Sequence, residues 1–167
     1  LPTNGLSVAR MVGHLTYLSD DAMDTKFGRE LRSGSFELGQ DSELEFQVES
    51  YLRYQGSQFA DNFDANTYIL LTRVLDFFDL AREYNNDAVE AFSRVKSDFL
   101  VVSFTTDWRF SPERSREISN ALMTAGKNVS YAEIDSKAGH DAFLLPNERY
   151  EAVFKNYMQR VEKSLCE

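Results

Sequence analysis

The stretch Asp98 to Glu113, DFLVVSFTTDWRFSPE, decides the fold class. It opens with a mostly apolar run, residues 99–104, and turns polar at residues 105–107. Short apolar runs rich in β-branched and aromatic residues, without alternation, are typical of strands buried on both faces, and such strands belong to parallel sheets covered by helices. The stretch therefore predicts a central strand of an α/β fold, with Asp107 at the carboxyl edge where open α/β sheets bind ligands.

A second strand, followed by a histidine, lies further along the chain. Residues 129–134 alternate apolar and polar side chains well enough for a strand, and Gly139, His140 and Asp141 follow it. An acid after one strand and a histidine after the next is the order in which α/β-hydrolases present the last two members of a Ser-Asp-His triad. Acids and histidines are also common after strands in structural roles, so the order alone leaves both interpretations open.

Helices are predicted around these two strands. Ser111 at the N-cap, Pro112 at the first helical position and Gly126 at the C-cap predict a crossover helix, which lets the strands run parallel. A last helix after Pro146 would cover the sheet with an apolar stripe made of Tyr150, Val153, Phe154, Tyr157, Met158 and Val161.

The first 97 residues contain no comparable strand and are predicted to be helical. Residues 28–42, rich in glycine and serine, are interpreted as a loop, and Gly56 as a point where a helix bends or is interrupted. Residues 5–27 are predicted to form two helices joined by a turn, with Ser19 as the N-cap of the second helix. Further helices are predicted over residues 43–63, 65–78 and 88–94, the last two with Asp64 and Asp87 as N-caps.

Composition narrows the class of partner. The chain of 167 residues has 27 acidic and 18 basic residues, a net charge of −9 and no Lys/Arg cluster, so nucleic acid and anionic membranes are not expected partners. No apolar run approaches the roughly 20 residues that span a bilayer. The single cysteine, Cys166, supports neither a disulfide framework nor a metal site, which fits a cytoplasmic protein.

Arg10 and Tyr17 are candidate binding residues on the first predicted helix. They are seven residues apart, so two helical turns bring them onto one face, about 10 Å apart along the axis, where both can reach one cleft. A solvated arginine beside a half-buried tyrosine is the more common arrangement. His14 falls on another part of the helix and is interpreted as a packing or surface residue.

Four blocks of the sequence resemble the homoserine O-acyltransferases. They are GLSVARMVGHLTYLSDDAM at residues 5–23, SFELGQDSELEF through LLTRVLDFFD at 35–79, FTTDWRFSPERSREI at 104–118 and EIDSKAGHDAFLL at 133–145. The resemblance implies the C-terminal part of an α/β-hydrolase fold, with helical lid hairpins at residues 1–97 and the last two strands with their covering helices at 98–167. It further implies an enzyme that acylates L-homoserine from acyl-CoA in methionine biosynthesis, and a homodimer formed through the lid.

The resemblance also implies site residues. Asp107 corresponds to the triad acid and His140 to the triad base, Asp141 to the carboxylate for the homoserine amino group, Arg10 to the arginine for its carboxylate, and Tyr17 to a further substrate contact. A zwitterionic amino acid requires a fixed cation and a fixed anion, and arginine offers a carboxylate a two-pronged fork. Acyl-CoA is expected as a co-substrate, with no metal or redox cofactor.

Arg109 is the candidate for acyl-donor specificity. It lies two residues beyond the acid, where members resembling succinyl-transferring enzymes carry arginine and acetyl-transferring relatives tend to carry an apolar residue. A cation here can pair with the free carboxylate of a succinyl group, whereas a surface arginine near a helix N-terminus is the alternative. Succinyl is therefore favoured over acetyl.

The sequence departs from the family at the nucleophile, because it contains no G-x-S-x-G elbow. Ser35 and Ser57 each follow a glycine directly, and neither lies between a predicted strand and helix. The serine, the oxyanion donors and the first strands are expected upstream of Leu1, in an N-terminal portion of the same enzyme. This chain alone is therefore expected to be inactive, and to self-associate through its lid helices or the open edge of the residue 99–104 strand.

Two alternatives remain at this point. The chain can be a non-catalytic helical and β-α-β module used for dimerisation or regulation, or part of a serine acyltransferase or esterase of the same fold.

Overall fold

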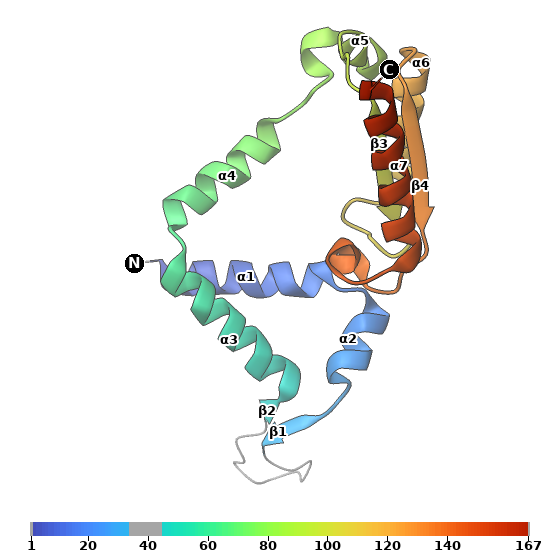
Figure 1. The fold of residues 1–167 in the computed structure, drawn as a ribbon. Coiled ribbons are helices and arrows are strands. Elements are labelled where there is room, and N and C mark those ends of the chain that lie inside the picture. Colours follow the sequence, from blue (N-terminus) through green and yellow to red (C-terminus); the bar gives the residue numbers. More distant parts are fainter. Residues whose placement is uncertain (1, 34–44, 167) are drawn as a thin grey trace. The chain divides into compact units, whose positions relative to one another are not determined.

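A computed structural model describes residues 2–33 and 45–166, and the chain divides into two compact units, Leu1–Phe78 and Asp79–Glu167 (Figure 1). Residues 79–97 fall in the second unit because α5 (Ala88–Ser93) packs against α6 (Pro112–Thr124). The predicted roles, a lid at residues 1–97 and a core segment at 98–167, stay predictions. Most of the predicted loop, including Ser35, lies outside the described residues.

The first unit is mainly helical, as predicted. Its helices are α1 (Thr3–Tyr17), α2 (Asp20–Phe27), α3 (Gln47–Asn62) and α4 (Ala65–Phe77). The predicted caps are confirmed, since Ser19 Oγ accepts the Ala22 amide at 3.1 Å and Asp64 Oδ2 accepts the Thr67 amide at 2.7 Å. Each cap satisfies a backbone donor that has no partner within the helix.

Gly56 lies where α1 and α3 pack against each other. A Cβ atom at this position would lie 2.9 Å from both the carbonyl oxygen of Ser7 and Cε of Met11. An interruption of the helix, one of the two predicted outcomes, is wrong, because α3 continues through Gly56. The absent side chain allows close helix packing, which offsets the helix-propensity cost of about 1 kcal/mol for glycine.

A short hairpin was not predicted. Strand β1 (Leu31–Ser33) pairs antiparallel with β2 (Glu45–Phe46), within residues interpreted as a loop and as the start of a helix. Helix α3 therefore begins at Gln47, where the Phe46 amide donates to Glu49 Oε2 at 2.9 Å. Strands of two or three residues are too short to show an alternating pattern.

The second unit contains the predicted strand-helix-strand arrangement. Strands β3 (Phe99–Phe104) and β4 (Val129–Ile134) pair in parallel over six residues each. Helix α6 is the crossover, and Gly126 just beyond it has φ +69°, which favours glycine. The remaining elements are η1 (Arg82–Tyr84), η2 (Gly139–Leu144) and α7 (Glu148–Cys166).

The two faces of this small sheet differ in chemistry. On the face covered by α7, Phe104, Ile134 and Ala142 form an apolar core, against which Tyr150 and Val153 pack. The strand residues 99–102 are only partly buried, less than the predicted two-sided burial. Towards their carboxyl ends the strands become fully buried, which gives the site a rigid base.

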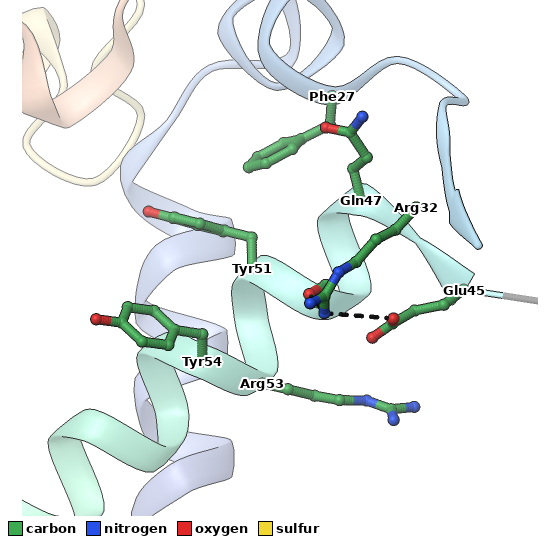
Figure 2. Close-up of a pocket in the computed structure, with 8 residues that line it drawn as sticks. Phe27, Arg32, Glu45, Gln47, Tyr51, Arg53 and Tyr54 are labelled. Carbon is green, nitrogen blue, oxygen red and sulfur yellow. Dashed lines mark hydrogen bonds and ion pairs between the residues drawn. The ribbon is translucent and has the colours of Figure 1, made fainter.

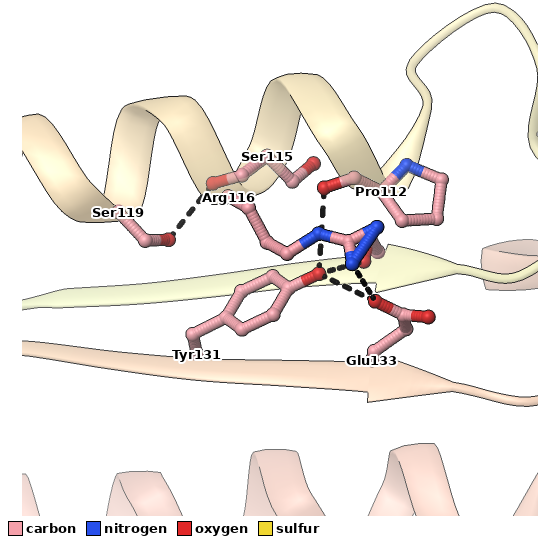
Figure 3. Close-up of polar contacts among 7 residues, drawn as sticks. Pro112, Ser115, Arg116, Ser119, Tyr131 and Glu133 are labelled. Carbon is pink, nitrogen blue, oxygen red and sulfur yellow. Dashed lines mark hydrogen bonds and ion pairs between the residues drawn. The ribbon is translucent and has the colours of Figure 1, made fainter.

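A polar cluster lies between the sheet and α6 (Figure 3). The Tyr131 hydroxyl lies 2.8 Å from Ser103 Oγ and donates to Glu133 Oε2 at 3.0 Å, and Arg116 Nη1 lies 3.5 Å from the same Glu133 oxygen. Burial raises the pKa of the Tyr131 hydroxyl, and the neighbouring Glu133 carboxylate raises it further. The cluster thus holds α6 against the strands while it keeps the phenol protonated.

Helix α4 contrasts with this packing. None of its residues is buried, and large apolar side chains are exposed along it, among them Ile69, Leu70, Leu71, Val74, Leu75 and Phe77. Tyr68 contacts the Phe59 ring edge-on at 6.0 Å. No helix within the described ranges is long and apolar enough to cross a membrane.

Candidate active site

Asp107 occupies the turn that follows β3. Its side chain is almost fully buried, at 7% exposed, and Oδ1 accepts the backbone amides of Arg109 and Phe110, both at 3.0 Å. A buried carboxylate is costly unless hydrogen-bonded, so these two amides fix its orientation and compensate for part of the lost hydration. The second oxygen, Oδ2, faces the turn after β4.

His140 lies in η2 and meets that second oxygen. Its Nδ1 lies 2.8 Å from Asp107 Oδ2, and its ring contacts those of Phe110 and Phe143, with centroids 5.0 and 5.7 Å away. The predicted pair, 33 residues apart in sequence, is thus brought together. A carboxylate on Nδ1 holds the imidazole in the tautomer whose Nε2 can accept a proton from a hydroxyl.

Two threonines connect the turns that carry the acid and the base. Thr105 Oγ1 donates to Asp135 Oδ1 at 3.0 Å and accepts the Ser136 amide at 3.0 Å. Thr106 Oγ1 donates to the Ser136 carbonyl at 2.8 Å and accepts the Gly139 amide at 3.0 Å. Sequence reasoning missed these contacts, although hydroxyls just before an acid, at the end of a parallel strand, were a usable signal.

Asp141 and Arg109 flank the pair in sequence. Asp141 is half-buried, and its carboxylate makes no hydrogen bond or ion pair within residues 2–33 and 45–166. Arg109 is exposed, and its backbone amide is one of the two donors to Asp107. Both are therefore held next to the acid or the base by the same turns.

Arg10 and Tyr17 lie on α1, in the first unit. The Arg10 guanidinium lies over the Phe59 ring of α3, 5.2 Å from its centroid. The Tyr17 ring folds back towards Gly13, where an added Cβ would lie 3.9 Å from it. The structure thus brings Arg10 together with α3, and Asp107 with His140 in the second unit.

His14 was interpreted as a packing or surface residue. The structure agrees with a packing role, because its Nδ1 lies 3.1 Å from the Tyr51 hydroxyl and its ring meets Tyr51 edge-on at 5.4 Å. The contact ties α1 to α3.

An open cavity of about 780 Å³ also lies in the first unit (Figure 2). Arg32 pairs with Glu45 at 3.4 Å across the hairpin beside it, and Tyr51 and Tyr54 of α3 contribute aromatic walls. None of the predicted site residues lines this cavity. Across the part of the chain that the structure describes, no group of three or more His, Cys, Asp or Glu side chains could hold a metal ion.

Two proteins that are similar in sequence carry the same name. The homoserine O-succinyltransferase of Saccharophagus degradans is 69% identical over 163 residues, which are 97% of this chain and 43% of that protein. The homoserine O-succinyltransferase of Cellvibrio japonicus is 67% identical over 162 residues, again 97% and 43%. This chain is related to the homoserine O-succinyltransferases. It spans less than half of their length, and no protein-family model matches it.

Solved structures confirm the predicted fold of this chain. A homoserine O-acetyltransferase from Bacillus anthracis superposes with a TM-score of 0.70 at 21% identity, over 84% of this chain and 37% of that one. Esterase E22 superposes with a TM-score of 0.64 at 19% identity, over 84% of this chain and 38% of that one. At these identities the likeness concerns the fold alone. The predicted fold class, the C-terminal part of an α/β-hydrolase fold, is therefore confirmed, as is the resemblance to the homoserine O-acyltransferases.

Proposed function

We propose that this chain is the C-terminal part of a homoserine O-succinyltransferase and supplies the acid and the base of its catalytic triad. The observation that carries the proposal is the 2.8 Å contact between His140 Nδ1 and the buried Asp107 carboxylate, at the carboxyl edge of a parallel sheet. The names of the relatives, at 58–69% identity, support the same reaction.

The proposed chemistry is a two-step acyl transfer. His140 Nε2 takes the proton of a serine hydroxyl, whose oxygen attacks the thioester carbonyl of acyl-CoA, and the proton passes to the departing thiolate. His140 then removes the proton of the homoserine hydroxyl, which attacks the acyl-serine ester and releases the serine with that proton. Asp107 stabilises the imidazolium in both steps. The serine is proposed to come from the longer protein, outside these 167 residues.

Homoserine recognition is proposed for Arg10, Asp141 and Tyr17. Arg10 is supported because stacking on Phe59 restricts its guanidinium plane while its N–H edge still offers paired donors to a carboxylate. Asp141 is supported because a half-buried carboxylate without a polar partner among the described residues suits an incoming ammonium group. Tyr17 is proposed as a further contact from the helix that carries Arg10.

Succinyl-CoA is the proposed donor, with Arg109 as the residue that selects it. The names of the relatives favour succinyl, and the exposed Arg109 lies two residues from the acid, where its charge can pair with the distal succinyl carboxylate. The cytoplasm as its location and a homodimer as its assembly belong to the same proposal.

The test uses the full-length enzyme that contains this segment. It is incubated with L-homoserine and either succinyl-CoA or acetyl-CoA, and thiol release is followed with mass analysis of the product. Asp107→Asn should lower kcat by about 10⁴-fold, because the carboxylate no longer fixes the tautomer. Asp135→Asn makes the same change at the exposed acid after β4 and should leave kcat within about threefold.

Three results bear on different parts of the proposal. Full activity in Asp107→Asn would reject the triad assignment, and preference for acetyl-CoA would reject the donor. Hydrolysis of simple esters without acyl transfer to homoserine would favour an esterase of the same fold. The 167-residue chain by itself should show no turnover.

A further inference from the structure

The Thr106 hydroxyl spans the turn that leads to His140. It donates its single proton to the Ser136 carbonyl at 2.8 Å and accepts the Gly139 amide at 3.0 Å. Both roles are satisfied at once, because a hydroxyl has one donor and two acceptor positions. One side chain thus holds both ends of the turn formed by residues 136–139.

The contact between Thr106 and Gly139 bears on His140 because of the position of Gly139 in the chain. Gly139 directly precedes His140, is buried, and has φ +69°, a left-handed conformation that other residues adopt at a cost. Thr106 directly precedes Asp107. The acid and the base are therefore joined twice, once through their own side chains and once through their neighbours. Two points of attachment restrict rotation of the imidazole about the Asp107 contact more than one does.

Thr105 provides an internal comparison. Its hydroxyl bonds to Asp135 and to the amide and the carbonyl of Ser136, so it shares the Ser136 carbonyl with Thr106. Of the two hydroxyls, Thr106 alone accepts the Gly139 amide. Thr105 is also exposed, whereas Thr106 is half-buried. The two residues have the same chemistry and differ in the contact that Thr106 makes with Gly139, the residue before His140.

We infer that Thr106 is a positioning residue, which holds the backbone before His140 and so fixes the imidazole against Asp107. The inference rests on the proposed function for its catalytic meaning. The contact itself can be measured without catalysis.

The test is ¹⁵N-histidine NMR on this 167-residue chain, which contains two histidines, His14 and His140. The proton between His140 Nδ1 and Asp107 is followed by its chemical shift and its exchange rate with water. Thr106→Val should speed exchange by roughly 5- to 30-fold, as expected when one or two hydrogen bonds are lost. Thr106→Ser, which keeps the hydroxyl, should stay within about twofold of the wild type, with His14 signals unchanged.

Thr105→Val is the matched control and should also stay within about twofold, because Thr105 shares the Ser136 carbonyl with Thr106 but does not hold the Gly139 amide before His140. If Thr106→Val does not fold, Thr106→Ala removes the same bonds without an added methyl group and is compared with Thr106→Ser. An unchanged His140 signal in the variants without the hydroxyl, or equal changes in Thr106→Ser or Thr105→Val, would overturn the inference. Activity of the full-length enzyme enters neither outcome, so failure of the proposed function is a separate result.

Discussion

The turn around Asp107 and the helix α4 differ in how far their side chains find partners within their own unit. Asp107 is buried, yet both of its oxygens have partners within 40 residues of sequence, namely two backbone amides and His140. Helix α4 has apolar residues on most of its surface and none of them is buried. The acid-base pair is thus complete within one β-α-β unit, whereas α4 gains little from packing inside its own unit.

This difference separates contacts that follow from the pairing of two neighbouring strands from contacts that require a further covering surface. A parallel pair of strands brings the turns after both strands to one edge, so the acid, the base and the contact between them all lie within residues 99–141. Burial of an amphipathic or all-apolar helix requires a surface to cover it. The predictions below test this contrast, from the largest expected effect to the smallest.

The same substitution at two leucines should have very different effects. Leu122 of α6 is 0% exposed and Leu75 of α4 is 75% exposed. Leu122→Ala should lower the free energy of unfolding of the second unit by about 2–5 kcal/mol, because it leaves a cavity. Leu75→Ala should change stability by no more than about 0.5 kcal/mol. Urea titration followed by Trp108 fluorescence and by circular dichroism measures both, and equal losses would contradict the contrast.

Gly56→Ala tests whether the first unit has a tightly packed region of its own. The added methyl group would meet the Ser7 carbonyl and Met11 at 2.9 Å, so α1 and α3 must separate, with an expected loss of about 1–3 kcal/mol. Gly5→Ala is the control, because nothing lies within 4 Å of its added Cβ and alanine favours helix by up to about 1 kcal/mol. Thermal unfolding should show opposite signs for the two variants, and the same sign in both would reject the packing argument.

The exposed face of α4 should drive self-association. Leu71→Glu combined with Leu75→Glu places two charges on that face, and it should weaken association of this chain by about tenfold or more. Light scattering over a range of concentrations measures the effect. Lys96→Glu, at an exposed position outside the helix, is the control because it makes the same change of −2 in net charge. A strictly monomeric wild-type chain, or unchanged association in the double variant, would contradict the prediction.

The raised pKa of Tyr131 predicts a small effect of pH on the stability of the folded chain. Its pKa is raised in the folded chain above the ordinary value of 10.0, chiefly by burial, so above about pH 10 the unfolded chain loses the phenol proton first. The stability associated with the buried phenol is thus fully present below the unfolded pKa and declines as pH rises through the folded one. Tyr131→Phe should remove this decline, seen as a shallower loss of Tm between pH 9 and about 11. Equal slopes in the two proteins would contradict the prediction.

The acid-base pair was accessible from sequence because strand order determines which turns meet. Residues 99–104 and 129–134 formed the predicted strands, and Asp107 and His140 follow their carboxyl ends. The position of Thr105 and Thr106 just before the acid was a usable signal, but the partner of each hydroxyl was not accessible, because it depends on which way the hydroxyl rotates. The triad role of the pair and the substrate roles of Arg10, Tyr17, Asp141 and Arg109 stay predictions.

Errors arose where local rules compete with packing. The low helix propensity of Gly56 led to the prediction that the helix bends or is interrupted there. In the structure α3 continues, and Gly56 allows its close approach to Ser7 of α1. The β1–β2 hairpin was missed because its strands are too short for a pattern. The packing of α5 on α6, which places residues 79–97 in the second compact unit, is a tertiary contact that periodicity cannot show.

The crossover geometry of the second unit has a practical consequence. The turn at Gly126, which joins α6 to β4, lies at the end of the strands opposite to the acid and the base, about 20 Å away for strands of this length. Gly126 is exposed, and an added Cβ there would meet nothing within 4 Å. A fluorescent reporter or peptide tag grafted into this turn would therefore leave the contact between Asp107 and His140 undisturbed.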